Sequence, residues 1–136
     1  MIRALLALLL ATSAAAAAPL DEAARAQVGV TVIYDPAYVR LAFPGGDLPP
    51  DRGVCTDVVI LAFRAARGID LQLAVNRDMR TAFSAYPALW GLKTTDRNID
   101  HRRVPNLETL FRRIAAERPV TSDASDYLPG DVVSSG

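Results

Sequence analysis

The sequence predicts an α+β fold in one small domain, with helices gathered beside a small sheet. Three segments carry apolar residues at the spacing of an amphipathic helix, and a fourth forms a shorter helical pattern. Only two short segments, one at each end of the domain, are rich in the β-branched residues typical of strands. A chain of 136 residues has room for one domain of this kind.

The first 18 residues have the order of a secretory signal peptide. A positive start at Arg3 is followed by an unbroken apolar run at residues 4–11 and by small residues at 14–18. This run is too short to cross a bilayer, which takes about 20 apolar residues. We therefore expect residues 1–18 to be removed and residues 19–136 to form the domain of an exported protein without an integral membrane span.

The composition excludes several classes of partner and site. Fifteen basic residues balance fifteen acidic ones, so net charge gives no reason to expect nucleic acid as a partner. Hydrophobic residues make up 51% of the chain, which is too many for a disordered protein. A single Cys and a single His exclude an intramolecular disulfide and a Cys-based or His-rich metal site. We predict neither a metal nor a cofactor.

The first part of the domain combines short elements with a shaped loop. Residues 21–28 form the short helical pattern, which Asp21 can cap and Gly29 can end. Residues 30–34 are β-branched and aromatic, and the Asp-Pro pair that follows ends this predicted strand. Residues 42–53 hold so many Gly and Pro residues that both helix and central strand are excluded there.

The remainder of the domain is mostly helical. Residues 55–67 have a wide apolar face and stop at Gly68, and residues 70–83 show a second helical pattern. A third helix is predicted to begin at Asn106, which we expect to be its cap. Residues 131–133 follow a Pro-Gly turn and read as the start of a strand.

The lone cysteine is the first candidate functional residue. Cys55 follows the Gly/Pro-rich loop and stands at the amino end of the best helix. Free backbone N–H groups and the helix dipole stabilise a thiolate at such a position, and the same N–H groups can stabilise an oxyanion. The alternative is a small buried residue on the first turn of the helix, because free Cys is among the most buried residue types.

A resemblance to a known family favours the first interpretation. The stretch around Cys55 and several segments before and after it resemble, in colinear order from about residue 22 to residue 133, the DUF1287 family of exported bacterial proteins. The segments that carry this resemblance are YDPAY at 34–38, PGGD at 44–47, DRGVCTDVVI at 51–60, FSAYP at 83–87, WGL at 90–92, DRNIDHRRVPNL at 96–107 and YLPGDVV at 127–133.

The resemblance implies a fold and an activity. The family is similar to the NlpC/P60 branch of the papain-like superfamily, whose helical lobe carries a nucleophilic Cys and packs on an antiparallel sheet. It implies a periplasmic cysteine hydrolase, an amidase or endopeptidase acting on amide bonds of peptidoglycan peptides or another envelope amide. Cys55 would be the nucleophile and its backbone N–H an oxyanion donor. Tyr34 is a second candidate donor, as an upstream Tyr serves in some relatives; core packing is its simpler interpretation.

The same resemblance leaves the general base unassigned. The superfamily places its catalytic His on a strand after the Pro-Gly-Asp turn, and this sequence ends at Gly136, before such a strand. We therefore expect a chain truncated at its carboxyl terminus, with an incomplete sheet and no activity of its own. His101 is a candidate base or orienting residue. The alternative, which we prefer, is that its ring holds a loop against the core.

Three charged residues are candidate substrate contacts, and two functions remain open. Asp57, Arg102 and Arg103 suit the polar ends of a peptide, although Asp57 can instead interact with helix N–H groups and the arginines can form a solvated face. The first function is the thiol hydrolase. The second is a non-catalytic envelope protein that binds wall peptide or a protein partner.

Overall fold

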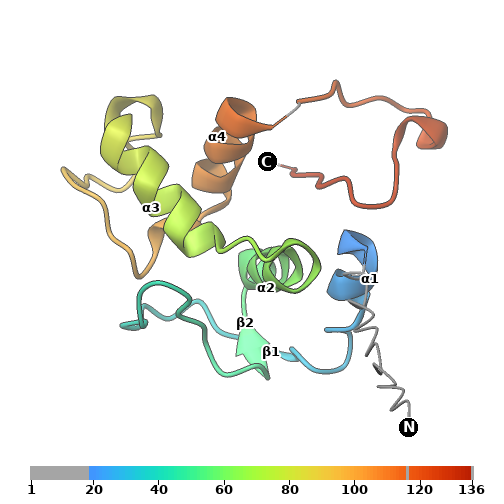
Figure 1. Ribbon diagram of the computed structural model, residues 1–136, viewed down its shortest axis with the longest axis horizontal. Helices are drawn as coiled ribbons and strands as arrows, with labels where there is room; N and C mark the ends of the chain where they lie inside the picture. Colours follow the sequence, from blue (N-terminus) through green and yellow to red (C-terminus); the bar gives the residue numbers. More distant parts are fainter. Residues whose placement is uncertain (1–18, 116, 136) are drawn as a thin grey trace, which may run out of the picture.

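The computed structural model of the chain describes residues 19–115 and 117–135, so the expected signal peptide lies outside the described residues. Its central element is a long helix with another helix on one side and two more on the other (Figure 1). In chain order the elements are α1 (Leu20–Arg25), β1 (Ile33–Tyr34), β2 (Arg52–Gly53), α2 (Cys55–Arg67), α3 (Leu71–Thr81), the 3-10 turns η1 (Phe83–Ala85) and η2 (Asp100–Arg102), α4 (Val104–Ile114) and the 3-10 turn η3 (Ala124–Asp126).

The hydrophobic core lies between α2, α3 and α4. Leu71, Val75 and Met79 recur every four residues along α3, which places them on one face of that helix. They pack against Ile60 of α2 and Leu110 of α4, and all five side chains are buried. Each fully buried aliphatic side chain contributes about 1.5–3 kcal/mol relative to an exposed one. The apolar spacing of α3 thus places its buried face against the core, whereas Ile114 at the end of α4 is exposed.

Helix α2 has the bounds predicted from the sequence. It begins at Cys55 and ends before Gly68, whose φ of 64° is the left-handed conformation that a helix-terminating glycine adopts. Its first turn is closed by Asp57, because the carboxylate accepts a hydrogen bond of 2.7 Å from the backbone N–H of Val54. The residue before Cys55 is therefore tied to the helix that it precedes.

The other two long helices differ from prediction at their ends. The Asp70 side chain caps α3 by accepting a hydrogen bond of 3.0 Å from the backbone N–H of Gln72, but the helix ends at Thr81 rather than at residue 83. Helix α4 begins at Val104, so the prediction that Asn106 caps it is wrong. Asn106 lies inside the first turn, where its side-chain amide donates to the carbonyl of Asp100 at 3.0 Å.

The small sheet also corrects the prediction. The structure pairs β1 with β2 in parallel, with Tyr34 opposite Gly53, whereas we expected an antiparallel sheet. A parallel pair needs a long connection, and the Gly/Pro-rich loop between the two strands supplies it. Residues 131–133, predicted as a strand, are not a strand in the structure. The coarse class, helices with a small sheet, agrees with α+β.

The amino-terminal elements are shorter than the sequence predicts. Helix α1 ends at Arg25, three residues before the expected bound, and residues 26–30 form turns. A backbone hydrogen bond of 3.0 Å from Val30 to Gln27 closes one of these turns, so the strand predicted from residue 30 starts only at Ile33.

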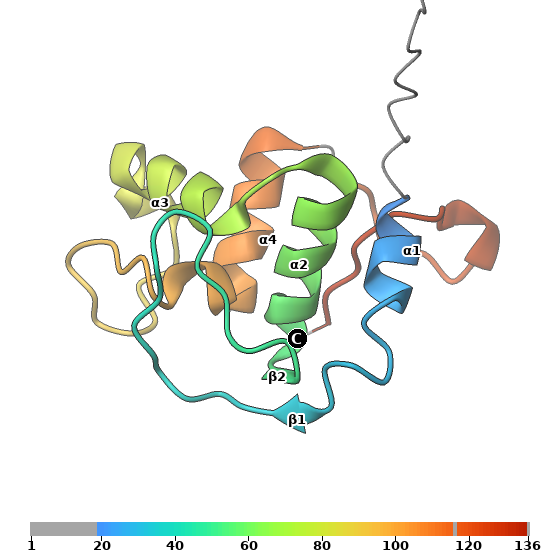
Figure 2. The same cartoon turned by 60° about the horizontal axis from the view of Figure 1, so that its bottom comes forward.

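The loop between β1 and β2 runs out to α3 and returns to α2 (Figure 2). The buried side chain of Gln72 holds it, donating to the carbonyls of Ala42 and Arg97 and accepting from the backbone N–H of Gly46, each at 3.0 Å. The carbonyl of Ala42 would lie 2.0 Å from a Cβ at Gly46, so only glycine fits there. This packing fixes the path along which the chain enters α2.

Within residues 19–115 and 117–135, no helix is long and apolar enough to cross a bilayer.

Candidate functional site

Cys55 is the first residue of α2, and its side chain is exposed. It follows β2 and Val54 directly, so the chain turns from the strand into the helix at this cysteine. The backbone N–H groups of Cys55 and Thr56 donate to no other described residue, as is usual for the first turn of a helix. The structure thus presents a thiol beside two free N–H donors.

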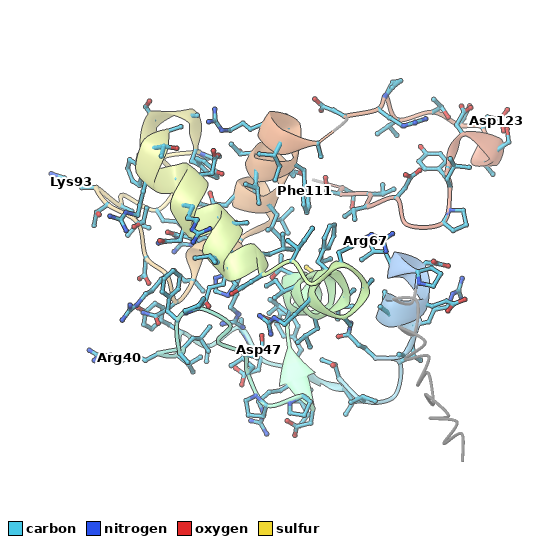
Figure 3. All side chains as sticks on the ribbon, viewed as in Figure 1. Arg40, Asp47, Arg67, Lys93, Phe111 and Asp123 are labelled. Carbon is cyan, nitrogen blue, oxygen red and sulfur yellow. The ribbon has the colours of Figure 1, made fainter. Side chains whose placement is uncertain are left out.

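A groove of about 790 Å³ opens beside the thiol. Cys55 and Val59 of α2 form one wall, and Leu107 and Phe111 of α4 form another. Phe111 lies between α4 and α2, where its ring stacks on Phe63 with 5.4 Å between the ring centroids (Figure 3). The carboxyl-terminal segment, residues 118–135, forms the remaining side of the groove. Two walls of the groove are therefore apolar in part, and the thiol lies at its edge.

An ion pair between Asp57 and Arg102 holds the start of α2 in place. The Nε and Nη2 atoms of Arg102 donate to the two carboxylate oxygens of Asp57 at 3.0 and 3.1 Å. The same guanidinium donates to the carbonyls of Asp35 and Ala37 at 3.1 and 3.0 Å, and its side chain is only 1% exposed. Arg102 therefore joins η2, the first turn of α2 and the chain that follows β1.

Thr56 adds a second link between the same elements. Its hydroxyl donates to the carbonyl of Arg102 at 2.9 Å, and its side chain is buried. The structure thus brings two of the predicted substrate contacts together, but Asp57 and Arg102 bind each other and the backbone. A role for either in binding substrate stays a prediction.

His101 lies in the interior, 2% exposed, on the turn η2. Burial lowers the pKa of its imidazole to about 4, and the nearby Asp57 carboxylate offsets this shift only in part. The ring is therefore neutral at pH 7. His101 does not line the groove beside Cys55, and its Nδ1 atom has no hydrogen-bond partner among the described residues. The ring is thus buried at η2 and away from the groove, and its role in holding the turn against the core stays a prediction.

The two tyrosines before the loop have different surroundings. Tyr34 is 76% exposed on β1, and it lines no part of the groove although its backbone pairs with Gly53. Tyr38 is bound to the loop before η2, because its hydroxyl donates to Asp96 at 3.0 Å and accepts from Asn98 at 2.9 Å. Neither tyrosine lines the groove, and the exposure of Tyr34 shows that the expectation of core packing for it is wrong.

Arg103, the third predicted substrate contact, lies elsewhere. Its guanidinium covers the ring of Trp90 at 4.0 Å from the ring centroid, and its Nη1 atom is 3.6 Å from Asp100. Neither Arg103 nor Trp90 lines the groove at Cys55. The two arginines predicted as substrate contacts are therefore separated: Arg102 holds the first turn of α2, and Arg103 lines a second cavity.

Comparison with known proteins agrees with the family resemblance that the sequence segments around Cys55 indicate. A family model described as "Domain of unknown function (DUF1287)" matches residues 21–136. The chain belongs to the DUF1287 family. It is 56% identical over 113 residues to "Uncharacterized protein YijF" of Escherichia coli (strain K12), an alignment that covers 83% of this chain and 55% of the relative. The DUF1287 chain therefore spans about half the length of that curated relative. No solved structure matches it significantly.

Sequence reasoning missed the wall that α4 gives to the groove. The apolar spacing of Leu107 and Phe111 predicts that both are buried in the core, yet Phe111 is half-buried and lines the groove. Their four-residue spacing signals one helix face, but it does not reveal which part of that face stays uncovered. Nor does the sequence reveal Gln72 as the anchor of the loop, because a polar residue within a helical pattern is ordinarily exposed.

The described residues contain no group of three or more His, Cys, Asp and Glu side chains that could hold a metal ion.

Proposed function

We propose that this DUF1287 chain is the cysteine-bearing part of an exported thiol hydrolase, an NlpC/P60-like amidase or endopeptidase that acts on amide bonds of cell-wall peptides. The exposed thiol of Cys55, at the start of α2 and at the edge of a groove of about 790 Å³, carries the proposal. The papain-like fold and the periplasmic location are parts of the same proposal, and they rest on the family resemblance.

The chemistry follows from the position of the thiol. The Cys55 sulfur, as a thiolate, attacks the carbonyl carbon of the scissile amide, and a carbon–sulfur bond forms. The negative charge that moves to the carbonyl oxygen is stabilised by the backbone N–H groups of Cys55 and Thr56, which have no other partner among the described residues. The carbon–nitrogen bond then breaks, the amine leaves with a proton, and water hydrolyses the thioester.

Proton transfer to the leaving amine is the work of an imidazole in the proposed superfamily. No imidazole is among the described residues that line the groove, and His101 is neutral and buried in the core. The proposal therefore assigns the attack and the oxyanion site to this chain and leaves the general acid and base unassigned. In this mechanism Asp57 and Arg102 position Cys55, and Tyr34 is a secondary candidate for oxyanion binding.

The position of His101 is the observation that favours the second function. An envelope protein that binds wall peptide or a protein partner through the same groove needs a shaped, partly apolar channel and no general base. The groove has apolar walls from α2 and α4 and charged residues such as Glu108 and Arg112 along it. The two functions predict different outcomes with an activated substrate and with a peptide.

An activated aryl ester tests the nucleophile without a proton donor, because nitrophenolate leaves unprotonated. We expect p-nitrophenyl acetate to release one rapid equivalent of nitrophenolate and to leave an acetyl group on Cys55, detected by mass spectrometry. Cys55→Ser should abolish the burst. A matched control carries Cys55→Ser with Ser122→Cys, which puts the thiol on an exposed loop away from the helix terminus. An equal burst from this control would contradict activation of Cys55 by its site.

Stem peptides released from cell wall then separate the two functions. Amide cleavage that Cys55→Ser abolishes would establish the hydrolase. Protection of Cys55 from iodoacetamide by the peptides, without cleavage even when imidazole is added as an external base, would favour the binding protein. Neither protection nor cleavage would contradict both functions for wall peptides.

A further inference from the structure

A second cavity, of about 290 Å³, lies beside the loop that leads into α4. It shares no lining residue with the groove at Cys55. Phe83, Tyr86 and Trp90, which follow α3, contribute its aromatic walls. Asp100 of η2 and Arg103 and Asn106 at the start of α4 contribute the polar side. The cavity is thus apolar on one side and charged on the other.

Each of the three polar residues leaves one buried atom without a hydrogen-bond partner among the described residues. These atoms are Oδ1 of Asp100, Oδ1 of Asn106 and Nη1 of Arg103. The other oxygen of Asp100 accepts from the backbone N–H of Asp96, and the amide nitrogen of Asn106 donates to the carbonyl of Asp100. Both side chains are therefore fixed, with their remaining oxygens unused, and each residue is 1% exposed.

The ion pair in the cavity is too long to satisfy its own members. Nη1 of Arg103 lies 3.6 Å from Oδ1 of Asp100, which is beyond a hydrogen bond. The guanidinium is held over the Trp90 ring at 4.0 Å from its centroid, so stacking fixes its plane. A buried polar group without a partner is costly, so these fixed and unpaired atoms favour a ligand that can pair with all of them.

We propose that this cavity binds a small zwitterion, an α-amino acid with an apolar side chain. Its ammonium group donates to the free oxygens of Asp100 and Asn106, its carboxylate accepts from Arg103, and its side chain packs on Phe83 and Trp90. The two acceptors and one cationic donor match the ammonium and carboxylate that every free amino acid carries on one carbon atom.

Ligands of other charge fit less well. A simple amine would meet the Arg103 cation, a simple carboxylate would meet Asp100, and an uncharged apolar molecule would leave all three atoms unpaired. Burial raises the pKa of the Asp100 carboxyl, against the opposing effects of the Asp96 N–H and of Arg103. This carboxylate is therefore short of favourable partners, which an ammonium group supplies.

The protein carries its own reporter for this site, because Trp90 is the single tryptophan of the chain and is 39% exposed at the cavity. We expect leucine and norleucine to change the Trp90 fluorescence of the full chain in a saturable way. N-acetyl-leucine, which lacks the ammonium, and leucine methyl ester, which lacks the carboxylate, should each bind about tenfold more weakly or worse. Glycine, which has no side chain to pack, should also bind more weakly.

Two variants and a control complete the test. Asp100→Asn and Arg103→Gln should each reduce leucine affinity about tenfold or more, whereas Arg80→Gln, an exposed arginine of α3 that does not line the cavity, should leave it unchanged. If a variant does not fold, as judged by its thermal melt, the binding of leucine and its blocked derivatives to the unaltered protein still tests the proposal. No fluorescence change up to about 10 mM leucine, or equal binding of N-acetyl-leucine methyl ester, would overturn the proposal.

Discussion

The charged residues Asp57 and Arg102 support other parts of the structure rather than facing solvent. Asp57 accepts hydrogen bonds from Arg102 and from the residue before Cys55, so one carboxylate both closes the first turn of α2 and fixes a buried guanidinium. A buried guanidinium is tolerated only when it is paired, since the desolvation of a lone charge costs several kcal/mol. The position of the thiol therefore depends on a contact that it does not itself make.

Replacement of Asp57 tests this dependence. Asp57→Asn preserves the shape of the side chain but leaves Arg102 without a counter-charge in the interior. We expect the free energy of unfolding to fall by about 3 kcal/mol, measured by denaturant titration. The control is Asp51→Asn, whose partner Arg52 lies at the surface, and which should lower the free energy of unfolding far less. Equal losses in the two variants would contradict a supporting role for the buried pair.

His101 predicts a pH dependence with a definite sign. Its pKa is about 4 in the folded chain and about 6.5 when unfolded, so the unfolded chain binds the proton more readily. The stability that the neutral ring provides is present above pH 6.5 and is lost as the pH falls from there to 4. The loss is on the order of 3 kcal/mol, because each pKa unit corresponds to about 1.4 kcal/mol.

Urea unfolding of the unaltered protein and of His101→Gln, each measured at several pH values, isolates this effect. Asp100, whose raised pKa acts in the opposite direction, is present in both proteins and cancels from the difference. Asp78, whose pKa is lowered chiefly by its hydrogen bond from Arg113, loses its contribution only below about pH 3.8. The variant should show a flatter profile between pH 6.5 and 4. A parallel profile would mean that His101 does not cause the acid loss.

Single residues were predictable where a local rule decides them. Cys55 was expected at the start of a helix because a Gly/Pro-rich loop precedes it, and the structure places it there. Asp57 was expected near helix N–H groups, and it accepts from Val54. The burial of Arg102 was not predictable, because its partners lie 45 residues or more away in the sequence. Contacts between residues so far apart leave no periodic pattern in the sequence.

At the scale of elements, the helices were easier to predict than the strands. Helices α2, α3 and α4 repeat their apolar residues at a local spacing that the sequence displays directly. The pairing of β1 with β2 depends on residues about 19 apart, and two-residue strands are too short to show alternation. The buried turn η2 lies in a segment rich in charged residues, and the sequence does not reveal its burial.

The loop from β1 to β2 is held by close packing, and Gly46 is its tightest point. A Cβ in Gly46→Ala would lie 2.0 Å from the carbonyl of Ala42, and the backbone there is held by Gln72. We expect a loss of about 3 kcal/mol or more in the free energy of unfolding. Gly68→Ala, which meets no atom within 4 Å and carries only the left-handed strain of φ 64°, should cost about 1 kcal/mol. Similar melting temperatures for the two variants would contradict the packing argument.

At the scale of the whole molecule, the beginning of α4 contributes to two separate sites. Leu107 lines the groove at Cys55, while its neighbour Asn106 lines the second cavity. Successive residues of a helix point about 100° apart, so adjacent positions face different neighbours. A ligand at one cavity and a ligand at the other would therefore contact the same turn of helix from two directions.

The carboxyl-terminal segment contributes to the groove but not to the core. The main core cluster is built from α2, α3, η1, Tyr86 and α4, and Val120, Leu128 and Val133 remain exposed. Its contacts with the helices include a surface hydrogen bond of 2.6 Å from Ser134 to Glu108. A chain that stops after residue 116 should therefore unfold cooperatively, with a free energy within about 1 kcal/mol of the full chain.

The same deletion makes a second, opposite prediction for the cysteine. Because residues 118–135 form one side of the groove, their removal should speed the alkylation of Cys55 by a bulky maleimide. The rate with the smaller iodoacetamide should change less, because the thiol is already exposed. Loss of cooperative unfolding would show that the segment supports the helices, and unchanged maleimide rates would show that it leaves the groove open. In this view the helices determine the stability of the fold, and the carboxyl-terminal segment limits the access of large reagents to Cys55. One deletion measures both.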